Sequence, residues 1–350
     1  MALVERIFIA HSLSLMKKRQ SLCAIALLSL LMAALHSTSA IAQGARGWTT
    51  FVNGTLWQTA AGDTVQAHAP GFLYERGRWW MVGEDRANGG KPDVNLYSSR
   101  DLQHWRFERK IIANGITSPL LGRERMIERA KLLKSPVTGR YVVWCHWEAS
   151  NYGASESACF SCATIDGDYV QEWAGRPCGI KARDCNVFVD EDGTAYFIAT
   201  TNENQDLGLF RLSTDYTRVV AHTPLLQGLR REAPAVVKIG DTYYMLSSAC
   251  TGWAPNQCKL SYSKSLTEGW SPLEDVGDAT CYRTQAAAIL TIKGTKQTTY
   301  LYVGDRWKDP TLAESKTIVF PVTFQDHHCQ IFPLERFQLN LHTGVWRNVE

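Results

Sequence analysis

One cassette recurs along the chain and constrains its fold more than any other feature. Each copy begins with a glycine-containing turn and continues into a short strand rich in aromatic and β-branched residues. The turn glycines, 47 to 62 residues apart, are Gly77, Gly139, Gly193, Gly240 and, in a weaker copy, Gly294. A period near 50 with about four short strands per unit and almost no helical pattern is typical of a β-propeller. We therefore predict an all-β, five-bladed β-propeller, with a β-sandwich as the second choice.

The N-terminal segment, residues 1–42, is predicted to be a secretory signal peptide. A basic run at 17–19 precedes an apolar run at 22–35, and a small-residue cleavage site follows. Met16, directly before the basic run, is a better start than the first methionine. We therefore expect residues 43–350 to form a single propeller domain that is secreted or periplasmic.

The charge balance argues against two classes of partner. The chain carries 37 Lys and Arg against 34 Asp and Glu, and removal of residues 1–42 leaves 33 of each. A neutral chain without a basic cluster is a poor ligand for nucleic acid or for an anionic membrane. No other apolar stretch approaches the length of a membrane span.

Nine of the ten cysteines fall in the predicted mature part, and this odd number leaves at least one free thiol. Cys159 and Cys162 form a CxxC motif, but no second pair completes a zinc site. Export permits disulfides, and we expect them within 159–185 and across 250–258, with the connectivity open. We predict no metal site and no cofactor; whether a structural calcium ion is present stays open.

Acidic side chains stand at matched positions, shortly before the glycine turns. In a propeller the innermost strand of each blade lines the axis, so the residues that begin these strands converge on one pocket. The second, third and fourth units place Glu128, Asp184 and Glu232 there, and the fifth places the amide of Gln285. The first unit has His68 and no acid. Each acid has an arginine within one residue, so the alternative is a set of structural ion pairs.

Carboxylates that face one another across a pocket suit glycoside hydrolysis, which needs one protonated acid and a second group that activates water. Glu232 leads into an apolar edge strand, where burial raises a carboxyl pKa and favours a general acid. A third acid can raise that pKa further by repulsion. Trp253, on a Gly- and Pro-containing loop after the Glu232 hairpin, is placed to stack on a sugar.

With these residues assembled, the chain from about Gly44 to Asn348 resembles glycoside hydrolase family 43, and most closely its exo-β-1,3-galactanase branch. One motif, Glu128-Arg129-Ala130-Lys131, matches the branch's Glu-Arg-Pro-Lys except at the third position. The other matching segments are Arg183-Asp184 with 188–193, Glu232-Ala233-Pro234-Ala235, 251–256, and Gly304-Asp305-Arg306-Trp307.

The resemblance implies roles for individual residues. Glu232 corresponds to the general acid, and Asp184 to the residue that tunes and orients it. The ligands of the terminal sugar correspond to Tyr152, Asn204, Thr251 and Trp253. The wider family carries an Asp on the first inner strand; this chain and the galactanase branch lack it. Gln285 stands where the branch has its catalytic glutamine, which implies that this amide activates water beside Glu128. An amide is a poor base at neutral pH, so the division of the base role stays open.

The resemblance also implies an activity: an inverting enzyme that releases galactose from the non-reducing end of β-1,3-galactan, the arabinogalactan backbone. We expect the enzyme to be a monomer. Its partner would be a polysaccharide or oligosaccharide. One alternative is an α-L-arabinofuranosidase or β-xylosidase on the same propeller, against which the missing first-blade Asp counts. Another is a propeller that binds glycan without cleaving it, against which the presence of Glu232 and Asp184 counts. The remaining alternative is an exported β-protein whose acids are structural.

Overall fold

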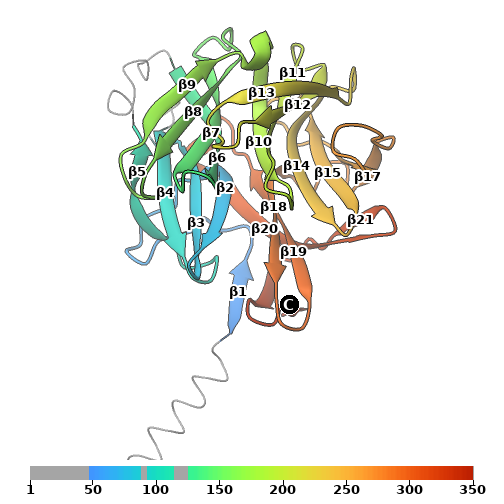
Figure 1. The fold of residues 1–350 in the computed structure, drawn as a ribbon. Helices are drawn as coiled ribbons and strands as arrows, with labels where there is room; N and C mark the ends of the chain where they lie inside the picture. Colours follow the sequence, from blue (N-terminus) through green and yellow to red (C-terminus); the bar gives the residue numbers. More distant parts are fainter. Residues whose placement is uncertain (1–46, 88–92, 114–124, 350) are drawn as a thin grey trace, which may run out of the picture. The chain divides into compact units, whose positions relative to one another are not determined.

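The computed structural model describes residues 47–87, 93–113 and 125–349. The predicted signal peptide and the alternative start at Met16 lie outside these residues. Within them the regular structure consists of β-strands and two single-turn 3-10 helices, η1 (Pro177–Gly179) and η2 (Leu312–Glu314) (Figure 1). None of the helices in the described part of the chain is long and apolar enough to span a membrane. The all-β prediction is therefore confirmed.

Five antiparallel sheets have four strands each, in chain order. The first contains β2 (His68–Glu75), β3 (Arg78–Asp85), β4 (Asp93–Ser99) and β5 (Arg106–Ile112). The second contains β6 (Arg125–Lys134), β7 (Tyr141–Ala149), β8 (Glu156–Cys162) and β9 (Val170–Gly175). The third contains β10 (Ala182–Val189), β11 (Ala195–Thr201), β12 (Asp206–Leu212) and β13 (Val219–Leu225). The fourth contains β14 (Arg231–Ile239), β15 (Thr242–Ala249), β16 (Cys258–Ser263) and β17 (Glu274–Val276). The fifth contains β18 (Gln285–Lys293), β19 (Thr298–Arg306), β20 (Lys316–Gln325) and β21 (His328–Ile331).

The prediction of five blades is wrong, because the described residues form a sixth sheet. It has three strands in the order β1-β22-β23, from β1 (Trp48–Val52), β22 (Arg336–Asn340) and β23 (Trp346–Asn348). Phe51 of β1 stacks on Phe337 of β22 with ring centroids 4.7 Å apart. Both belong to the core shared by the first and fifth four-stranded sheets. The prediction missed this sheet because β1 comes from the opposite end of the chain. Its β22–β23 hairpin does contain a glycine turn at Gly344, 50 residues after Gly294, which we did not count as a copy of the cassette.

The cassette itself forms the first hairpin of each four-stranded sheet. Gly77 and Gly193 have φ of +74° and +83°, a conformation that L side chains rarely adopt, so glycine closes these tight turns. The flanking aromatic and β-branched residues then pack between neighbouring sheets. Trp144 of the second sheet, for example, lies 5.3 Å from Phe197 of the third, measured between ring centroids. The gaps between sheets are filled in this way around the fold.

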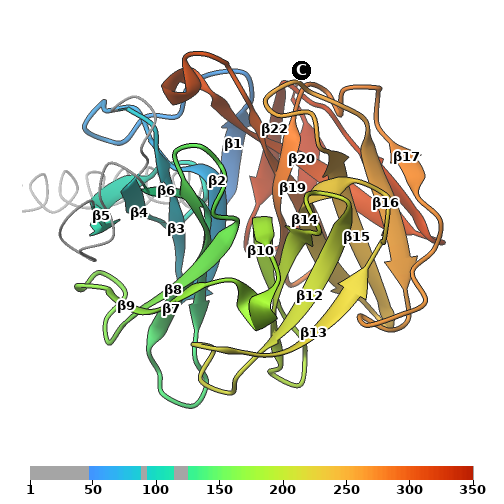
Figure 2. The same ribbon diagram turned by 90° about the horizontal axis from the view of Figure 1, so that it is seen from above.

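The first strands of the four-stranded sheets surround a common axis. Viewed from above, the sheets follow one another around a centre, with β10 and β14 near it and β17 at the periphery (Figure 2). Successive first strands are in contact, and β18 contacts β2 to close the ring. The buried Lys131 side chain donates from Nζ to the carbonyl oxygens of Ala69 (2.9 Å), Pro70 (2.7 Å) and Ala287 (3.1 Å). Asn186 donates to Pro234 and Ala287 carbonyls, so two polar side chains tie all five strands together.

Candidate active site

Each first strand carries a β-bulge close to its first residues, where the candidate side chains lie. The pairing with the second strand is interrupted between His68 and Gly71, Glu128 and Lys131, Ala182 and Cys185, Glu232 and Ala235, and Ala286 and Ala288. In a regular strand, successive side chains point to opposite faces. At the bulge Arg129 has φ +52°, and both Glu128 and Arg129 line one cavity. The bulges therefore re-aim side chains toward the axis, a known use of this irregularity.

The cavity has a volume of about 350 Å³, within the range of small-molecule sites. Its acidic and amide side chains include all four predicted catalytic residues: Glu128, Asp184, Glu232 and Gln285. The remaining lining residues are Glu84, Arg86, Arg129, His146, Tyr152, Arg183, Asn204, Cys250, Gly252, Trp253 and Trp307. The structure thus brings the four predicted residues together in one pocket.

Glu232 is buried and has a strongly raised pKa. Burial is the largest cause, and the charge of Asp184 adds to it; Arg129 and hydrogen bonds from Cys250 and Gln285 oppose the shift. The resulting pKa of Glu232 is about 8. At neutral pH this carboxyl is therefore mainly protonated, which is the state that a general acid needs.

Gln285 is held by four hydrogen bonds that fix the orientation of its amide. Its Oε1 accepts from Arg129 Nη2 at 2.6 Å and from the indole N–H of Trp307 at 2.9 Å. Both partners can only donate, so this atom must be the oxygen. Its Nε2 donates to Glu232 Oε1 at 2.9 Å and to Ser248 Oγ at 3.0 Å. The amide therefore touches the candidate acid directly.

Glu128 is surrounded by donors, in contrast to Glu232. Its Oε1 accepts from Arg86 Nη2 at 2.9 Å and from the Tyr152 hydroxyl at 2.7 Å. Its Oε2 forms an ion pair with His146 Nδ1 at 3.2 Å. Burial alone would raise the pKa of Glu128, but His146, Arg86 and Tyr152 outweigh it and hold the pKa far below its usual range. Glu128 is therefore ionised at any working pH.

The arginines next to the acids in the chain do not pair with those acids. Arg129 Nε donates to Asp184 Oδ2 at 2.6 Å, not to Glu128. Arg231 donates to Ser247 Oγ at 3.1 Å and leaves Glu232 to other partners. The alternative of three local ion pairs therefore does not describe the site; Arg129 instead connects candidate residues of two different sheets.

Three of the four predicted sugar ligands line the cavity: Tyr152, Asn204 and Trp253. Thr251 is not among the lining residues. Its hydroxyl donates to the Ala254 carbonyl and accepts from Asn256 Nδ2, each at 2.7 Å, so it stabilises the loop that carries Trp253. The Trp253 ring lies edge-on to Trp307, with centroids 4.8 Å apart. Together these two rings form an aromatic wall suited to a sugar.

From the sequence we assigned no role to Glu84, Arg86, His146 or Trp307, which lie near or just after the ends of second strands. An antiparallel second strand ends where the first begins, so its last residues reach the same rim. Glu84 pairs with His68 in register, and His146 pairs with Glu128. Glu84 lies seven residues after Gly77, and His146 lies seven residues after Gly139. This shared spacing could have identified both residues. The first sheet therefore does supply an acid, Glu84, whose pKa is raised by burial.

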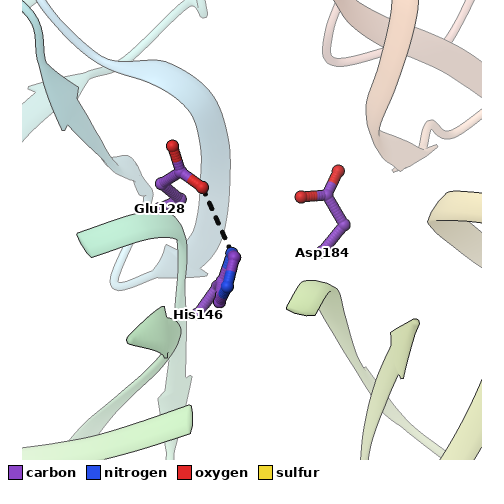
Figure 3. Close-up of side chains that lie close together, drawn as sticks. All are labelled: Glu128, His146 and Asp184. Carbon is purple, nitrogen blue, oxygen red and sulfur yellow. Dashed lines mark ion pairs between the residues drawn. The ribbon is translucent and has the colours of Figure 1, made fainter. Parts of the chain in front are cut away.

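One group in the pocket has the residue types of a metal site. Single ligand atoms of Glu128, His146 and Asp184 all lie within 4.8 Å of one another, and Figure 3 shows the three side chains reaching toward one space. Burial disfavours a charged imidazole, yet the neighbouring carboxylates raise the pKa of His146 to about 9, so it has no free lone pair at neutral pH. Arg86 and Arg129 already neutralise the two carboxylates. The donor set therefore favours an ion-pair network over a metal centre.

The nine cysteines among the described residues are all free thiols, so neither expected disulfide forms in this structure. Cys159 and Cys162 both lie on β8, and residues three apart in a strand point to opposite faces. Cys159 is buried in the core between the second and third sheets, and Cys162 in the core between the first and second. The CxxC spacing therefore brings no two sulfur atoms together here.

Comparisons with known proteins agree with this geometry. The model of glycosyl hydrolases family 43 matches residues 84–306. An exo-β-1,3-galactanase structure from Clostridium thermocellum is 34% identical, with a TM-score of 0.82 over 85% of this chain and 68% of that chain. An exo-β-1,3-galactanase from Phanerochaete chrysosporium, solved with β-1,3-galactotriose, is 29% identical, with a TM-score of 0.81 over 86% of this chain and 71% of that chain.

An α-L-arabinofuranosidase from Clostridium thermocellum shares only the fold, at 16% identity and a TM-score of 0.56 over 76% of this chain and 93% of that chain. No curated protein sequence matches the chain. The family match covers more than half of the chain and spans all four predicted catalytic residues. This chain therefore belongs to glycoside hydrolase family 43.

Proposed function

We propose that the protein is an inverting exo-β-1,3-galactanase that releases galactose from the non-reducing end of β-1,3-galactan. The observation that carries this proposal is the pair formed by Glu232 and Gln285. A buried glutamate with a pKa of about 8 is hydrogen-bonded to an amide that Arg129 and Trp307 hold in place. Galactanase structures about 30% identical to this chain support the choice of substrate.

In this proposal Glu232 protonates the glycosidic oxygen as the bond to the terminal galactose breaks. Its burial and the neighbouring charge of Asp184 keep the proton in place before the reaction. The product carboxylate forms beside Arg129, whose charge favours the ionised state. The aromatic wall of Trp253 and Trp307 holds a sugar ring next to the acid.

Two groups could act on the attacking water, and their chemistry differs. The amide oxygen of Gln285 already accepts from two donors, one of them the cationic Arg129, which lowers its basicity. Glu128 is ionised in the resting site, although the donors around it lower its basicity as well. Of the two groups only Glu128 carries a negative charge, so we assign to it the acceptance of a proton from the attacking water, and assign to Gln285 the placement of the acid and of the water. The negative charge of Glu128 also stabilises the oxocarbenium-like transition state.

The proposal also includes the setting in which the enzyme works. Residues 1–42 contain a basic run, then an apolar run, then a small-residue cleavage site. This order supports export to the periplasm or the medium. We also propose that the active unit is a monomer.

The direct test is incubation of the purified protein with β-1,3-galactobiose and chromatography of the products. We expect galactose from β-1,3-galactobiose and no comparable release from β-1,4-galactobiose or from an α-L-arabinofuranoside. Glu232→Gln, which keeps the shape of the acid, serves as the control for contaminating enzymes. Cleavage of the arabinofuranoside in preference to galactobiose, or no cleavage of either, would refute the proposal.

A further inference from the structure

His146 lies between two glutamates in the floor of the pocket. It is on β7 directly opposite Glu128 of β6 in the strand register, and its side chain is 2% exposed. Its Nδ1 lies 3.2 Å from Glu128 Oε2, and its Nε2 lies 3.0 Å from Glu148 Oε2. The imidazole therefore bridges a pocket carboxylate and a second carboxylate that does not line the pocket.

Glu148 is fully buried and is fixed by the backbone. Its Oε1 accepts main-chain N–H bonds from Ala149 at 2.9 Å, Ala154 at 2.7 Å and Ser155 at 3.0 Å. Burial would raise the pKa of Glu148, but its hydrogen bond to His146 and these backbone donors lower it to about 2. Glu148 is thus an ionised carboxylate, held by backbone N–H groups, that contacts His146 and does not face the pocket.

The charges around His146 come from several elements. Glu128 on β6 and Glu148 on β7 touch it, and the negative charge of Asp184 on β10 lies close by. Arg183, also on β10, lies 3.9 Å from Glu148 Oε2, and Arg86 pairs with both Glu84 and Glu128. The Tyr152 ring lies 6.4 Å from the imidazole, measured between centroids. The groups in contact with His146 are both anionic, so the imidazolium form is stabilised.

We propose that Glu148 and His146 act as a positioning pair for Glu128: Glu148 keeps the imidazole protonated and oriented, and the imidazolium holds Glu128 in the orientation used for catalysis. This inference rests on the proposed function for the reaction that Glu128 serves. Glu148 is not among the residues that line the pocket, and it reaches Glu128 through His146; its other charged neighbour is Arg183, at 3.9 Å. A purely structural role for Glu148, as the anchor of the 149–155 turn, is the competing explanation.

The isosteric change Glu148→Gln separates these explanations. The new amide oxygen can still accept from Ala154 and Ser155, while its N–H₂ group can donate to a neutral His146 Nε2. The turn is thereby preserved, and the imidazole loses the carboxylate that keeps it charged. We expect kcat on β-1,3-galactobiose to fall about 10- to 100-fold at pH 7 with little change in KM, as for other partners that orient a catalytic group. Because His146 regains its proton at lower pH, activity should partly recover there.

The effect of Glu148 on the protonation of His146 can also be measured without substrate. In the wild-type protein, NMR of the histidine side chains should show both ring nitrogens of His146 protonated at neutral pH, with the signal assigned by its loss in His146→Asn. In Glu148→Gln the same signal should titrate at a lower pH. The control is Glu172→Gln, an isosteric change in the same sheet at a residue that contacts Arg140 and Ser161. It should change neither kcat nor the titration of His146. If Glu148→Gln does not fold, the wild-type titration still tests the inference, because an ordinary pKa of His146 would overturn it.

The two possible failures differ in their signatures. A wild-type enzyme that releases no galactose would overturn the proposed function and leave the histidine titration intact. A wild-type His146 that loses its proton at an ordinary histidine pKa would overturn the inference. So would a folded Glu148→Gln variant with the wild-type kcat and pH profile.

Discussion

Asp184 offers a test of how the site keeps Glu232 protonated. With a pKa of about 8, Glu232 is protonated in about nine of ten molecules at pH 7, against about three in a thousand for a glutamate at the ordinary 4.5. The environment therefore enlarges the population with a competent acid about 300-fold at neutral pH. The negative charge of Asp184 is the second-largest contribution after burial.

Asp184→Asn removes that charge and keeps the geometry. The new amide oxygen can still accept from Arg129 Nε, which donates to Asp184 Oδ2 at 2.6 Å. Arg129, no longer neutralised, then lowers the pKa of Glu232 further. A neighbouring charge typically changes a pKa by about 1 to 3 pH units, so the basic limb of kcat/KM should move from near pH 8 to between about pH 5 and pH 7.

The loss of activity should therefore depend on pH. We expect kcat/KM of Asp184→Asn on β-1,3-galactobiose to fall about 2- to 100-fold at pH 7 and to change little near pH 4, where Glu232 stays protonated in both proteins. Asp168→Asn, the same change at an exposed carboxylate that pairs with Arg109, is the matched control. A variant slower by one constant factor at every pH would refute the reasoning and would make Asp184 only a positioning residue.

Three further experiments test other parts of the site. Glu232→Gln should reduce the turnover of galactobiose by about 10²- to 10⁴-fold, and should reduce much less the turnover of a galactoside with an excellent leaving group. Equal losses on these two substrates would show that Glu232 is not the acid. Proton NMR of the first minutes of hydrolysis should show α-galactose before β-galactose; an initial β-anomer would mean a covalent intermediate and a retaining mechanism. The turnover of galactobiose by both Gln285→Ala and Glu128→Gln should be strongly reduced. Lys131→Met should lower the free energy of unfolding by about 3 kcal/mol in denaturant titrations, because the carbonyl oxygens of Ala69 and Pro70 lose this donor and that of Ala287 keeps only Asn186. Unchanged stability would contradict the tie between β2, β6 and β18.

The residues that begin the inner strands were predictable because the cassette marks each hairpin. Once the glycine turns are aligned, Glu128, Glu232 and Gln285 take equivalent places, and the structure puts all three in one cavity. The hairpin of the sixth sheet was predictable in the same way from Gly344, but the addition of β1 was not, since it pairs with β22 across nearly the whole chain. Pairing between such distant segments leaves no periodic signal in the sequence.

The pairing of charges could not be predicted from neighbours in the chain. Arg129 follows Glu128 directly, yet the bulge and its φ of +52° send the guanidinium to Asp184 and Gln285. A sequence shows which charges are adjacent along a strand, but a single left-handed residue decides which of them meet across the axis. The same bulges explain why one short segment can supply two side chains to the pocket.

The two glutamates at equivalent bulges, Glu128 and Glu232, end with opposite pKa shifts, and their cross-strand partners account for much of the difference. Glu128 faces His146, whereas Glu232 faces Ser248 in the equivalent register. The imidazolium, with Arg86, holds the pKa of Glu128 down, while burial beside Asp184 raises that of Glu232 to about 8. When the pKa values of two neighbouring carboxyl groups are shifted in opposite directions, one group can act as the acid and the other as the anion. The division of labour in the site therefore follows from the surroundings of each glutamate: His146 on the second strand and Arg86 keep Glu128 ionised, whereas burial and Asp184 of the neighbouring sheet keep Glu232 protonated.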